Sequence, residues 1–171
     1  MKSKYLIAYF QPKGAESKSA AVAKAIESHM ADKGHEPKMF AITPVEEYPT
    51  DPAMLNAATK TEVETRTRPA IVGKISDGYY HDVKEIILVA PNWWNSVPMA
   101  VLTFFDQHDS NYKRLVPVIL HGGDGASKIL EELREFLPKT DVMPAVEISN
   151  DELKGDIQPK VDKVMEELSE K

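Results

Sequence analysis

Residues 85–98 read EIILVAPNWWNSVP. The first six form a mostly apolar run, which is typical of a strand buried on both faces of a sheet. Pro98 then suits the first turn of a helix. Because both tryptophans of the chain, Trp93 and Trp94, lie in the short connection between this strand and this helix, the segment predicts a strand–loop–helix unit with an aromatic loop.

The two adjacent indoles have alternative interpretations. Neighbouring residues in a loop usually point in different directions, so we expect at least one indole to be exposed or to cover a planar group. The alternative is that both rings close the end of the core. Loops at the carboxyl ends of strands are where open α/β sheets bind ligands. Trp93 and Trp94 are therefore candidate ligand contacts.

The remainder of the chain alternates strand and helix patterns. Helices with an apolar stripe are predicted after four of the strands. Ser17 or Ser19 is expected to cap the first of these helices, and the last one is expected to be interrupted near Gly155 and Pro159. Strands are predicted over residues 5–10, 38–42, 85–90, 114–120 and 142–148. This alternation predicts an α/β fold, with a five-stranded parallel sheet of order 2-1-3-4-5 inside a three-layer α/β/α sandwich.

Two features depart from the regular alternation. Residues 44–80 are long for a connection within a compact domain. Because residues 51–66 can form a helix, we predict an insert between the second and third strands that lies beside the sheet and contributes to a pocket or a dimer contact. Pro117 lies inside the fourth strand, where proline is unusual, so a bulge is expected there. The length of 171 residues suits one domain spanning residues 1–171.

Composition narrows the possible functions. A formal net charge of −6 argues against nucleic-acid binding, which needs a basic face. The absence of cysteine excludes disulfides, thiolate metal sites and cysteine-based catalysis, and fits a reducing cytoplasm. The apolar run at residues 5–10 is too short for a signal sequence or a membrane span. The five histidines lack HxH or HxxxH spacing, so no metal ligand is predicted and a metal hydrolase is a distant alternative.

Three loops are predicted at one edge of the sheet, since the carboxyl ends of parallel strands lie together. Residues 11–19 lead into a helix N-terminus, whose N–H groups and partial positive charge suit a phosphate. Residues 91–97 offer indole surface. Residues 121–125 contain three glycines, which let backbone N–H groups approach a ligand, and begin with His121, which can donate to a ligand oxygen. Together the loops describe a site for a flat phosphorylated molecule, and FMN fits that description.

Several of these segments resemble flavodoxin-like FMN-binding proteins of the large bacterial flavodoxin group. Residues 91–99 are similar to that group's P-x-W-W-x-x-x-P-M segment, and residues 103–106 and 121–125 resemble its T-F-L and T-H-G-G-S-G segments. Residues 44–73 resemble its insert. The resemblance implies a flavodoxin-like fold in which residues 91–97 line the isoalloxazine ring and residues 121–125 pack on its other side or rim.

The first loop departs from the S-x-T-G-N-T pattern of that group. Residues 11–19 form a longer loop without threonine, Glu16 lies within it, and Pro12 removes a backbone donor. Residues 17–19 are the predicted phosphate contacts, with Gly14 allowing the turn. The predicted cofactor-binding residues are Gln11, Lys13, Gly14, Ser17, Lys18, Ser19, Pro91, Asn92, Trp93, Trp94, Asn95, Ser96, Val97, His121, Gly122, Gly123, Asp124 and Gly125.

The expected function is that of a cytoplasmic FMN-binding redox protein, in which the chain orients and tunes the flavin. No catalytic residue is predicted, although His121 can assist proton delivery, and Asp124, in place of the group's serine, predicts a low flavin potential. The partner is either a redox protein that docks on an acidic face, or NAD(P)H with a quinone or flavin, which usually requires a homodimer. No nucleic-acid or membrane partner is expected. The alternative is a flavodoxin-like binding or interaction module that has lost FMN through its altered first loop.

Overall fold

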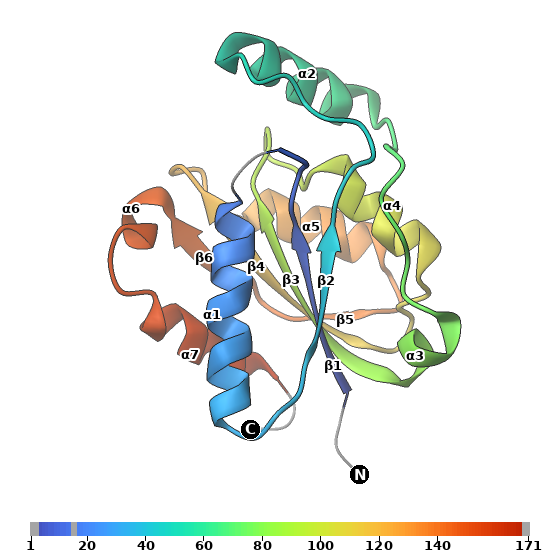
Figure 1. Ribbon diagram of the computed structural model, residues 1–171, viewed down its shortest axis with the longest axis vertical. Helices are drawn as coiled ribbons and strands as arrows, with labels where there is room; N and C mark the ends of the chain where they lie inside the picture. The colour runs from blue at the N-terminus through green and yellow to red at the C-terminus, as the bar shows by residue number, and fades with distance from the viewer. Residues whose placement is uncertain (1–3, 15–16, 169–171) are drawn as a thin grey trace.

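The computed structural model describes residues 4–14 and 17–168 of the chain. Strands and helices alternate along most of its length, and the named strands pair in parallel (Figure 1). The elements in chain order are β1 (Lys4–Phe10), α1 (Lys18–Asp32), β2 (Lys38–Ile42), α2 (Pro52–Thr65), α3 (Asp77–Asp82), β3 (Val83–Pro91), α4 (Met99–Gln107), β4 (Arg114–His121), α5 (Ser127–Phe136), β5 (Asp141–Val142), β6 (Val146–Ser149), α6 (Asn150–Leu153) and α7 (Gln158–Glu167).

The sheet places β1 between β2 and β3. Its strands follow the order β2-β1-β3-β4-β5, and β6 also pairs with β4. This confirms the predicted order 2-1-3-4-5. Because residues 5–9 of β1 pair in register with residues 85–89 of β3, the loops that follow these two strands open at the same edge of the sheet. From β1 the chain adds β2 on one side and then β3 on the other, and the site described below lies at this change of direction.

The prediction of one strand over residues 142–148 is wrong, because two short strands replace it. β5 ends at Val142 and β6 begins at Val146, with Pro144 between them, and proline has no N–H to donate to a sheet. Val142 pairs with Leu115 and Val146 pairs with Val118, so the stretch from Val142 to Val146 is one residue longer than the stretch of β4 that it faces. The bulge expected at Pro117 is absent from the pairing of β4 with β3, whose register is continuous. The irregularity lies in the neighbouring strand instead.

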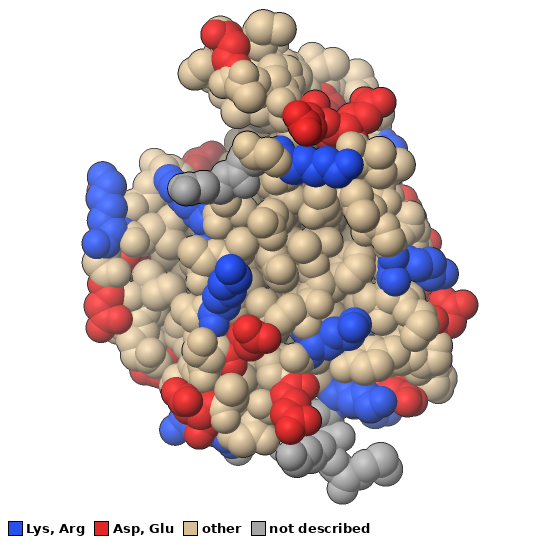
Figure 2. All heavy atoms as spheres, viewed as in Figure 1, with Lys and Arg blue, Asp and Glu red and all other residues tan. Residues whose placement is uncertain are grey.

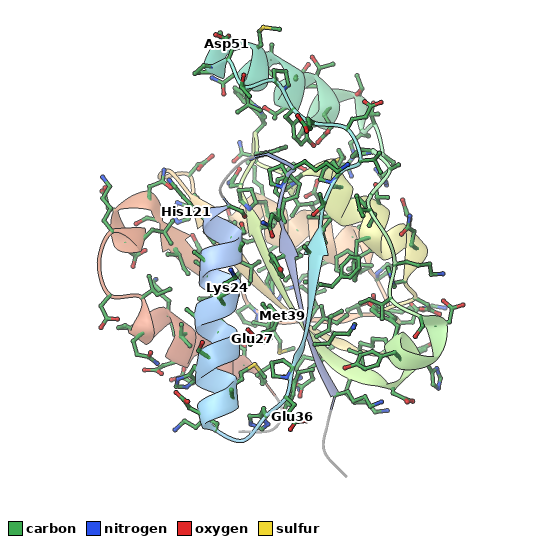
Figure 3. All side chains as sticks on the ribbon, in the orientation of Figure 1. Lys24, Glu27, Glu36, Met39, Asp51 and His121 are labelled. Atoms are coloured by element: carbon green, nitrogen blue, oxygen red, sulfur yellow. The ribbon has the colours of Figure 1, made fainter. Side chains whose placement is uncertain are left out.

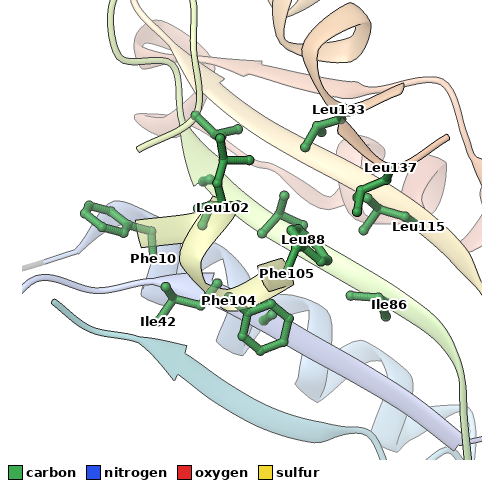
Figure 4. Close-up of a cluster of buried hydrophobic side chains, with 14 of the residues drawn as sticks. Phe10, Ile42, Ile86, Leu88, Leu102, Phe104, Phe105, Leu115, Leu133 and Leu137 are labelled. Carbon is green, nitrogen blue, oxygen red and sulfur yellow. The ribbon is translucent and has the colours of Figure 1, made fainter. Parts of the chain in front are cut away.

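The core consists of two layers of apolar side chains, one on each face of the sheet. Along β3, Ile86 and Leu88 face the layer covered by α4 and α5, whereas Ile87 and Val89 face the layer covered by α1 and α7. All four side chains are fully buried, as expected for a central parallel strand. Figure 4 shows the first layer, in which side chains of α4 and α5 pack on β3. Both faces of the sheet are therefore covered, which leaves its edges for ligand binding.

The segment between β2 and β3 holds two helices. The helix expected over residues 51–66 is α2. Asp51 caps its N-terminus, and a carboxylate oxygen of Asp51 accepts the Met54 N–H at 3.0 Å. Thr59 is the buried residue of this otherwise largely exposed helix. α2 stands beyond the carboxyl edge of the sheet (Figure 1). The sequence did not indicate α3, a short helix that Ser76 caps.

His108 shows how the segment between β2 and β3 is joined to the core. Its ring is 2% exposed and stacks on Phe104 with ring centroids 4.2 Å apart. Its Nδ1 lies 2.7 Å from the Phe104 carbonyl, and its Nε2 accepts the Ile75 N–H at 3.1 Å. The neutral ring with its proton on Nδ1 satisfies both contacts. Burial lowers the pKa of His108 below its usual value of 6.5.

The lowered pKa of His108 predicts loss of stability in acid. As pH falls below about 6.5, the unfolded chain takes up a proton at this histidine that the folded chain does not, so the free energy of unfolding decreases by up to about 1.4 kcal/mol per pH unit. Urea unfolding at a series of pH values measures the slope. In His108→Phe the slope should be shallower, whereas in the exposed control His81→Gln it should match the parent. An unchanged slope in His108→Phe would contradict the prediction.

Candidate functional site

The loops after β1, β3 and β4 enclose a cavity of about 470 Å³ at the carboxyl edge of the sheet. α2 and the start of α6 complete its wall. Figure 3 labels His121 at this edge and Asp51 at the beginning of α2 beyond it. The described residues that line the cavity are Phe10, Pro12, Ser17, Lys18, Ser19, Leu55, Pro91, Asn92, Trp93, Leu120, His121, Gly122 and Asn150. The structure therefore brings together the three loops that the sequence indicated.

The loop after β3 folds into a tight turn over residues 93–96. The backbones of Trp93 and Ser96 exchange two hydrogen bonds, of 2.8 and 3.0 Å. The two central residues, Trp94 and Asn95, have φ angles of 56° and 61°, as a type I′ turn requires. Asparagine tolerates this left-handed conformation, whereas tryptophan rarely adopts it. The Asn92 side-chain oxygen accepts the Asn95 N–H at 2.9 Å, which stabilises the turn.

The turn sends its two indoles in different directions. Trp93 lines the cavity and packs edge-on against Phe10 and Tyr48, with ring centroids 5.0 and 5.3 Å apart. Trp94 is 47% exposed and donates from Nε1 to the Thr59 hydroxyl of α2 at 3.1 Å. The expectation that the indoles diverge is confirmed, and the alternative that both close the core is wrong. Trp93 faces the cavity, and Trp94 anchors α2.

The first loop presents the beginning of α1 to the cavity. Ser17, rather than Ser19, caps the helix, and its hydroxyl accepts the Ala20 N–H at 3.0 Å while donating to the Phe10 carbonyl at 2.7 Å. Ser19 is buried, and Lys18 is exposed at the cavity rim. Glu16, which the sequence placed in this loop, lies outside the described residues. The Ser17 hydroxyl is therefore committed to the chain, while the first turn of α1 faces the cavity.

The glycine-rich loop after β4 is held in place by neighbouring side chains. His121 accepts the Gly123 N–H on Nδ1 at 3.0 Å, and its Nε2 lies 3.8 Å from a Glu147 carboxylate oxygen. The Asn92 amide donates to the Gly125 carbonyl at 2.8 Å, which joins this loop to the one after β3. Gly125 has φ +69°, and a Cβ there would lie 2.8 Å from Glu147. Only glycine fits this position without displacing Glu147.

A carboxylate of α5 supports the turn that carries the indoles. Glu132, whose side chain is 13% exposed, accepts the Val97 N–H at 3.0 Å on one oxygen. Its other oxygen accepts the Ser96 hydroxyl at 2.7 Å and the Arg66 guanidinium at 2.8 Å. Charge-assisted hydrogen bonds of this kind are stronger than neutral ones. Glu132 therefore fixes the loop after β3 and the end of α2 at once.

A second carboxylate joins α2 to the beginning of α4. Glu62 accepts the Tyr48 hydroxyl at 2.8 Å and the Met99 N–H at 3.3 Å. Burial raises the pKa of Glu62 above its usual value, and burial beside Glu62 likewise raises the pKa of Tyr48. Because Tyr48 also packs on Trp93, this pair connects the long segment before β3 to the cavity wall.

Comparison with protein families agrees with this geometry. A family model described as Flavodoxin matches residues 4–164. The chain belongs to the flavodoxin family. No curated protein matches it. Within the residues that the structure describes, this flavodoxin-family chain contains no helix long and apolar enough to cross a membrane.

Solved structures with the same fold include proteins described as flavin-binding. A protein from Bacteroides eggerthii, described as a candidate flavoprotein, is 21% identical, with 96% of this chain and 97% of that chain covered and a TM-score of 0.77. A flavoprotein from Lactobacillus acidophilus in complex with FMN is 18% identical, with 96% and 99% covered and a TM-score of 0.70. An NAD(P)H:quinone oxidoreductase from Methanothermobacter marburgensis is 12% identical, with 98% and 94% covered and a TM-score of 0.56. At these identities the likeness concerns the fold.

The cavity of this flavodoxin-family chain contains part of the predicted site. The predicted residues that line it are Ser17, Lys18, Ser19, Pro91, Asn92, Trp93, His121 and Gly122. The predicted residues outside its lining are Gln11, Lys13, Gly14, Trp94, Asn95, Ser96, Val97, Gly123, Asp124 and Gly125.

Sequence reasoning missed several lining residues. They are Phe10, Pro12, Leu55, Leu120 and Asn150. Asn150 directly follows β6, whose carboxyl end lies at the same edge as the three predicted loops, so the strand order alone could have indicated it. Leu55 belongs to the segment for which a contribution to a pocket or a dimer contact was expected, and the structure places it in the cavity wall.

Proposed function

We propose that the chain binds FMN in the cavity at the carboxyl edge of the sheet and works as a flavin-dependent redox protein. The observation that carries the proposal is the composition of that cavity, which has a helix N-terminus at one end, an indole in its wall and a glycine at its rim. Its volume of about 470 Å³ is within the range of small-molecule sites. Family membership and the FMN complex of the Lactobacillus acidophilus flavoprotein support the same ligand.

The phosphate of FMN would bind at the first turn of α1. The first N–H groups of a helix have no partner within the helix and carry a partial positive charge. Lys18 is the one lysine or arginine among the described lining residues and lies at this end of the cavity. Ser19 adds a hydroxyl beside it. This arrangement replaces the threonine-containing loop of the family with backbone donors and a single cation.

The isoalloxazine ring would lie along Trp93 and reach the rim formed by His121 and Gly122. When bound, the flavin supplies the capacity to take up and release electrons. The chain's own residues orient it, and Leu55 from α2 limits the access of water to the cavity. Because Nδ1 of His121 accepts a backbone N–H, the proton of the neutral ring is on Nε2. His121 thus holds a proton at the edge of the cavity, beside Glu147.

The partner is a redox protein or a small-molecule pair of NAD(P)H with a quinone or flavin. A protein partner would use the net charge of −6 for docking on an acidic face. The fold shared with the Methanothermobacter marburgensis oxidoreductase supports the second class. Oxidation of NADPH in the presence of a quinone distinguishes the two. A rate no higher than the buffer background would exclude the reductase.

The binding of FMN is tested by titration. Purified protein should carry a yellow flavin or, if free of it, should quench the fluorescence of added FMN in a saturable manner. Riboflavin, which lacks the phosphate, should bind more weakly if the first turn of α1 holds that group. A colourless protein that leaves FMN fluorescence unchanged would contradict the proposal. That result would favour a flavodoxin-like binding module without FMN.

Asp124 is predicted to lower the potential of the bound flavin. Its carboxylate is exposed in the glycine-rich loop, where its negative charge disfavours an anionic reduced flavin. Because an exposed charge contributes about 0.5 kcal/mol, Asp124→Ser should raise the two-electron potential by about 10 mV. Potentiometric titration measures the change. The control Asp32→Ser, at the far end of α1, should leave the potential unchanged, and a decrease in Asp124→Ser would refute the prediction.

A further inference from the structure

We infer that a second cavity, at the amino edge of the sheet, binds a mononucleotide of the type of adenosine 5′-phosphate (AMP). This cavity of about 480 Å³ is formed by α3, the start of β3, the end of α4 and the turn before β4. α3 lies at the opposite end of the molecule from α2 (Figure 1). Among the described residues, none lines both this cavity and the one assigned to the flavin. The inference is therefore independent of the proposed function.

The inner wall of this cavity is already fixed by contacts within the chain. Tyr80 is buried, and its hydroxyl forms a hydrogen bond with that of Ser110. The Lys113 ammonium lies 5.0 Å from the centre of the Tyr80 ring and donates to the carbonyls of Val83 at 2.7 Å and His81 at 3.3 Å. Because these groups already have partners, a ligand would be recognised by the exposed side chains at the rim.

Tyr112 offers an aromatic face at that rim. Its side chain is 84% exposed, and its backbone has a φ of 66°, a left-handed conformation that is uncommon for tyrosine. The turn is held firmly, because the Tyr112 N–H donates to the Lys139 carbonyl at 2.7 Å and the Lys113 N–H to the Ser110 carbonyl at 3.2 Å. Strain of this kind is frequent at ligand sites. An exposed ring on a rigid turn suits the stacking of a nucleotide base.

Polar side chains at the rim match the other parts of a nucleotide. Gln107 and Asn111 carry exposed amides, and such an amide can form two hydrogen bonds with adenine. Lys84 and His81 are exposed and can donate to a phosphate. Within the described part of the chain, these four side chains make no hydrogen bond or ion pair. Asp109 uses one carboxylate oxygen for the Asn111 N–H at 3.0 Å, which leaves the other for a ribose hydroxyl.

The charges around the cavity are balanced. Lys84 and Lys113 are offset by Asp77 and Asp109 in its lining. Figure 2 shows basic and acidic side chains together at the lower right of the view, where α3 lies. This balance argues against a nucleic acid, which needs a basic face. A mononucleotide needs a cation only at its phosphate end, and the volume is within the range of sites for small molecules.

The inference is tested by nuclear magnetic resonance on the ¹⁵N-labelled full chain without FMN. AMP should shift the backbone N–H signals of Lys84, Asn111 and Tyr112 in a saturable manner, and the signals of residues that line the flavin cavity should stay unchanged. Adenosine and ribose 5-phosphate each lack one part of AMP and should bind about threefold more weakly or worse. Because FMN is absent from the titration, the result does not depend on whether the chain binds FMN.

Variants of the rim separate the base from the phosphate. Tyr112→Asn introduces a residue that tolerates the φ of 66°, so its melting temperature should be no lower than that of the parent, whereas AMP affinity should fall about tenfold. Tyr112→Phe keeps the ring and should keep most of the affinity. Lys84→Gln should weaken AMP about threefold and leave adenosine unchanged. The control Lys24→Gln removes an exposed lysine of α1, outside this cavity (Figure 3), and should affect neither ligand.

Three results would overturn the inference. The first is the absence of saturable shifts around α3 at AMP concentrations up to about 10 mM, including the case in which AMP shifts only signals of the flavin cavity. The second is ribose 5-phosphate that binds as tightly as AMP, which would reduce the site to an anion patch. The third is a Tyr112→Asn variant that binds AMP as the parent does.

Discussion

Replacing Trp93 with alanine is expected to lower the affinity for FMN by about 30- to 100-fold, equivalent to about 2–3 kcal/mol. Trp93 is the tryptophan that lines the cavity at the carboxyl edge of the sheet. Phe10 and Tyr48 hold its ring edge-on at 5.0 and 5.3 Å, so its surface is available to a ligand without further ordering. Trp93→Phe, which keeps a smaller aromatic wall, should retain most of the affinity. Quenching of FMN fluorescence by the variants measures the change.

The neighbouring tryptophan supplies a matched control. Trp94 lies in the same turn, but its indole reaches α2 through Thr59. Trp94→Asn introduces a residue that tolerates the φ of 56° at this position. The variant should have a lower melting temperature, because it loses the hydrogen bond to Thr59, while its FMN affinity should stay within about threefold of the parent. Circular dichroism on each variant ensures that affinity is compared between folded proteins. Equal losses of affinity in Trp93→Ala and Trp94→Asn would contradict the separate roles assigned to the two rings.

The sheet could be predicted well because its signals are local. The run from Glu85 to Ala90 is apolar along nearly its whole length, and a central parallel strand needs that composition on both faces. The second strand has the predicted bounds, Lys38–Ile42. The prediction of the fifth strand was wrong because the break in that strand depends on Pro144 and on one extra residue relative to β4. Pairing with a neighbour is a property of two segments, and the sequence of one segment does not contain it.

The site was predictable in outline, since strand order brings the loops after β1, β3 and β4 to one edge. The direction of each indole was not, because it depends on a two-residue turn closed by Ser96 and on a hydroxyl in α2. Leu55 lies in α2, and no local pattern indicated which face of that helix meets the loops. Glu132 is an acidic residue on an amphipathic helix, where the usual expectation is exposure to water. Its contacts with residues 96 and 97 arise only once α5 packs beside the loop.

Replacing Glu132 with alanine is expected to reduce the free energy of unfolding by about 2–4 kcal/mol. The substitution removes the acceptor for the Val97 N–H, which belongs to a buried residue. It also removes one of the two acceptors within reach of the buried Ser96 hydroxyl, the other being the Val97 carbonyl at 2.9 Å. A buried donor without a partner loses its solvation and gains nothing in return. FMN affinity should decrease as well, because the turn that carries Trp93 is anchored at its end by these two hydrogen bonds. Urea unfolding and FMN titration measure the two effects.

Variants of the same network locate the origin of the loss. Glu132→Gln keeps an acceptor for one donor and should lose about half as much stability as Glu132→Ala. Arg66→Ala removes an ion-pair partner whose side chain is 48% exposed, and a pair of that kind contributes less than about 1 kcal/mol. Glu135→Ala, an exposed position on the same helix, should be neutral. If Arg66→Ala is as damaging as Glu132→Ala, the ion pair dominates, and the hydrogen bonds to the turn do not hold the site together.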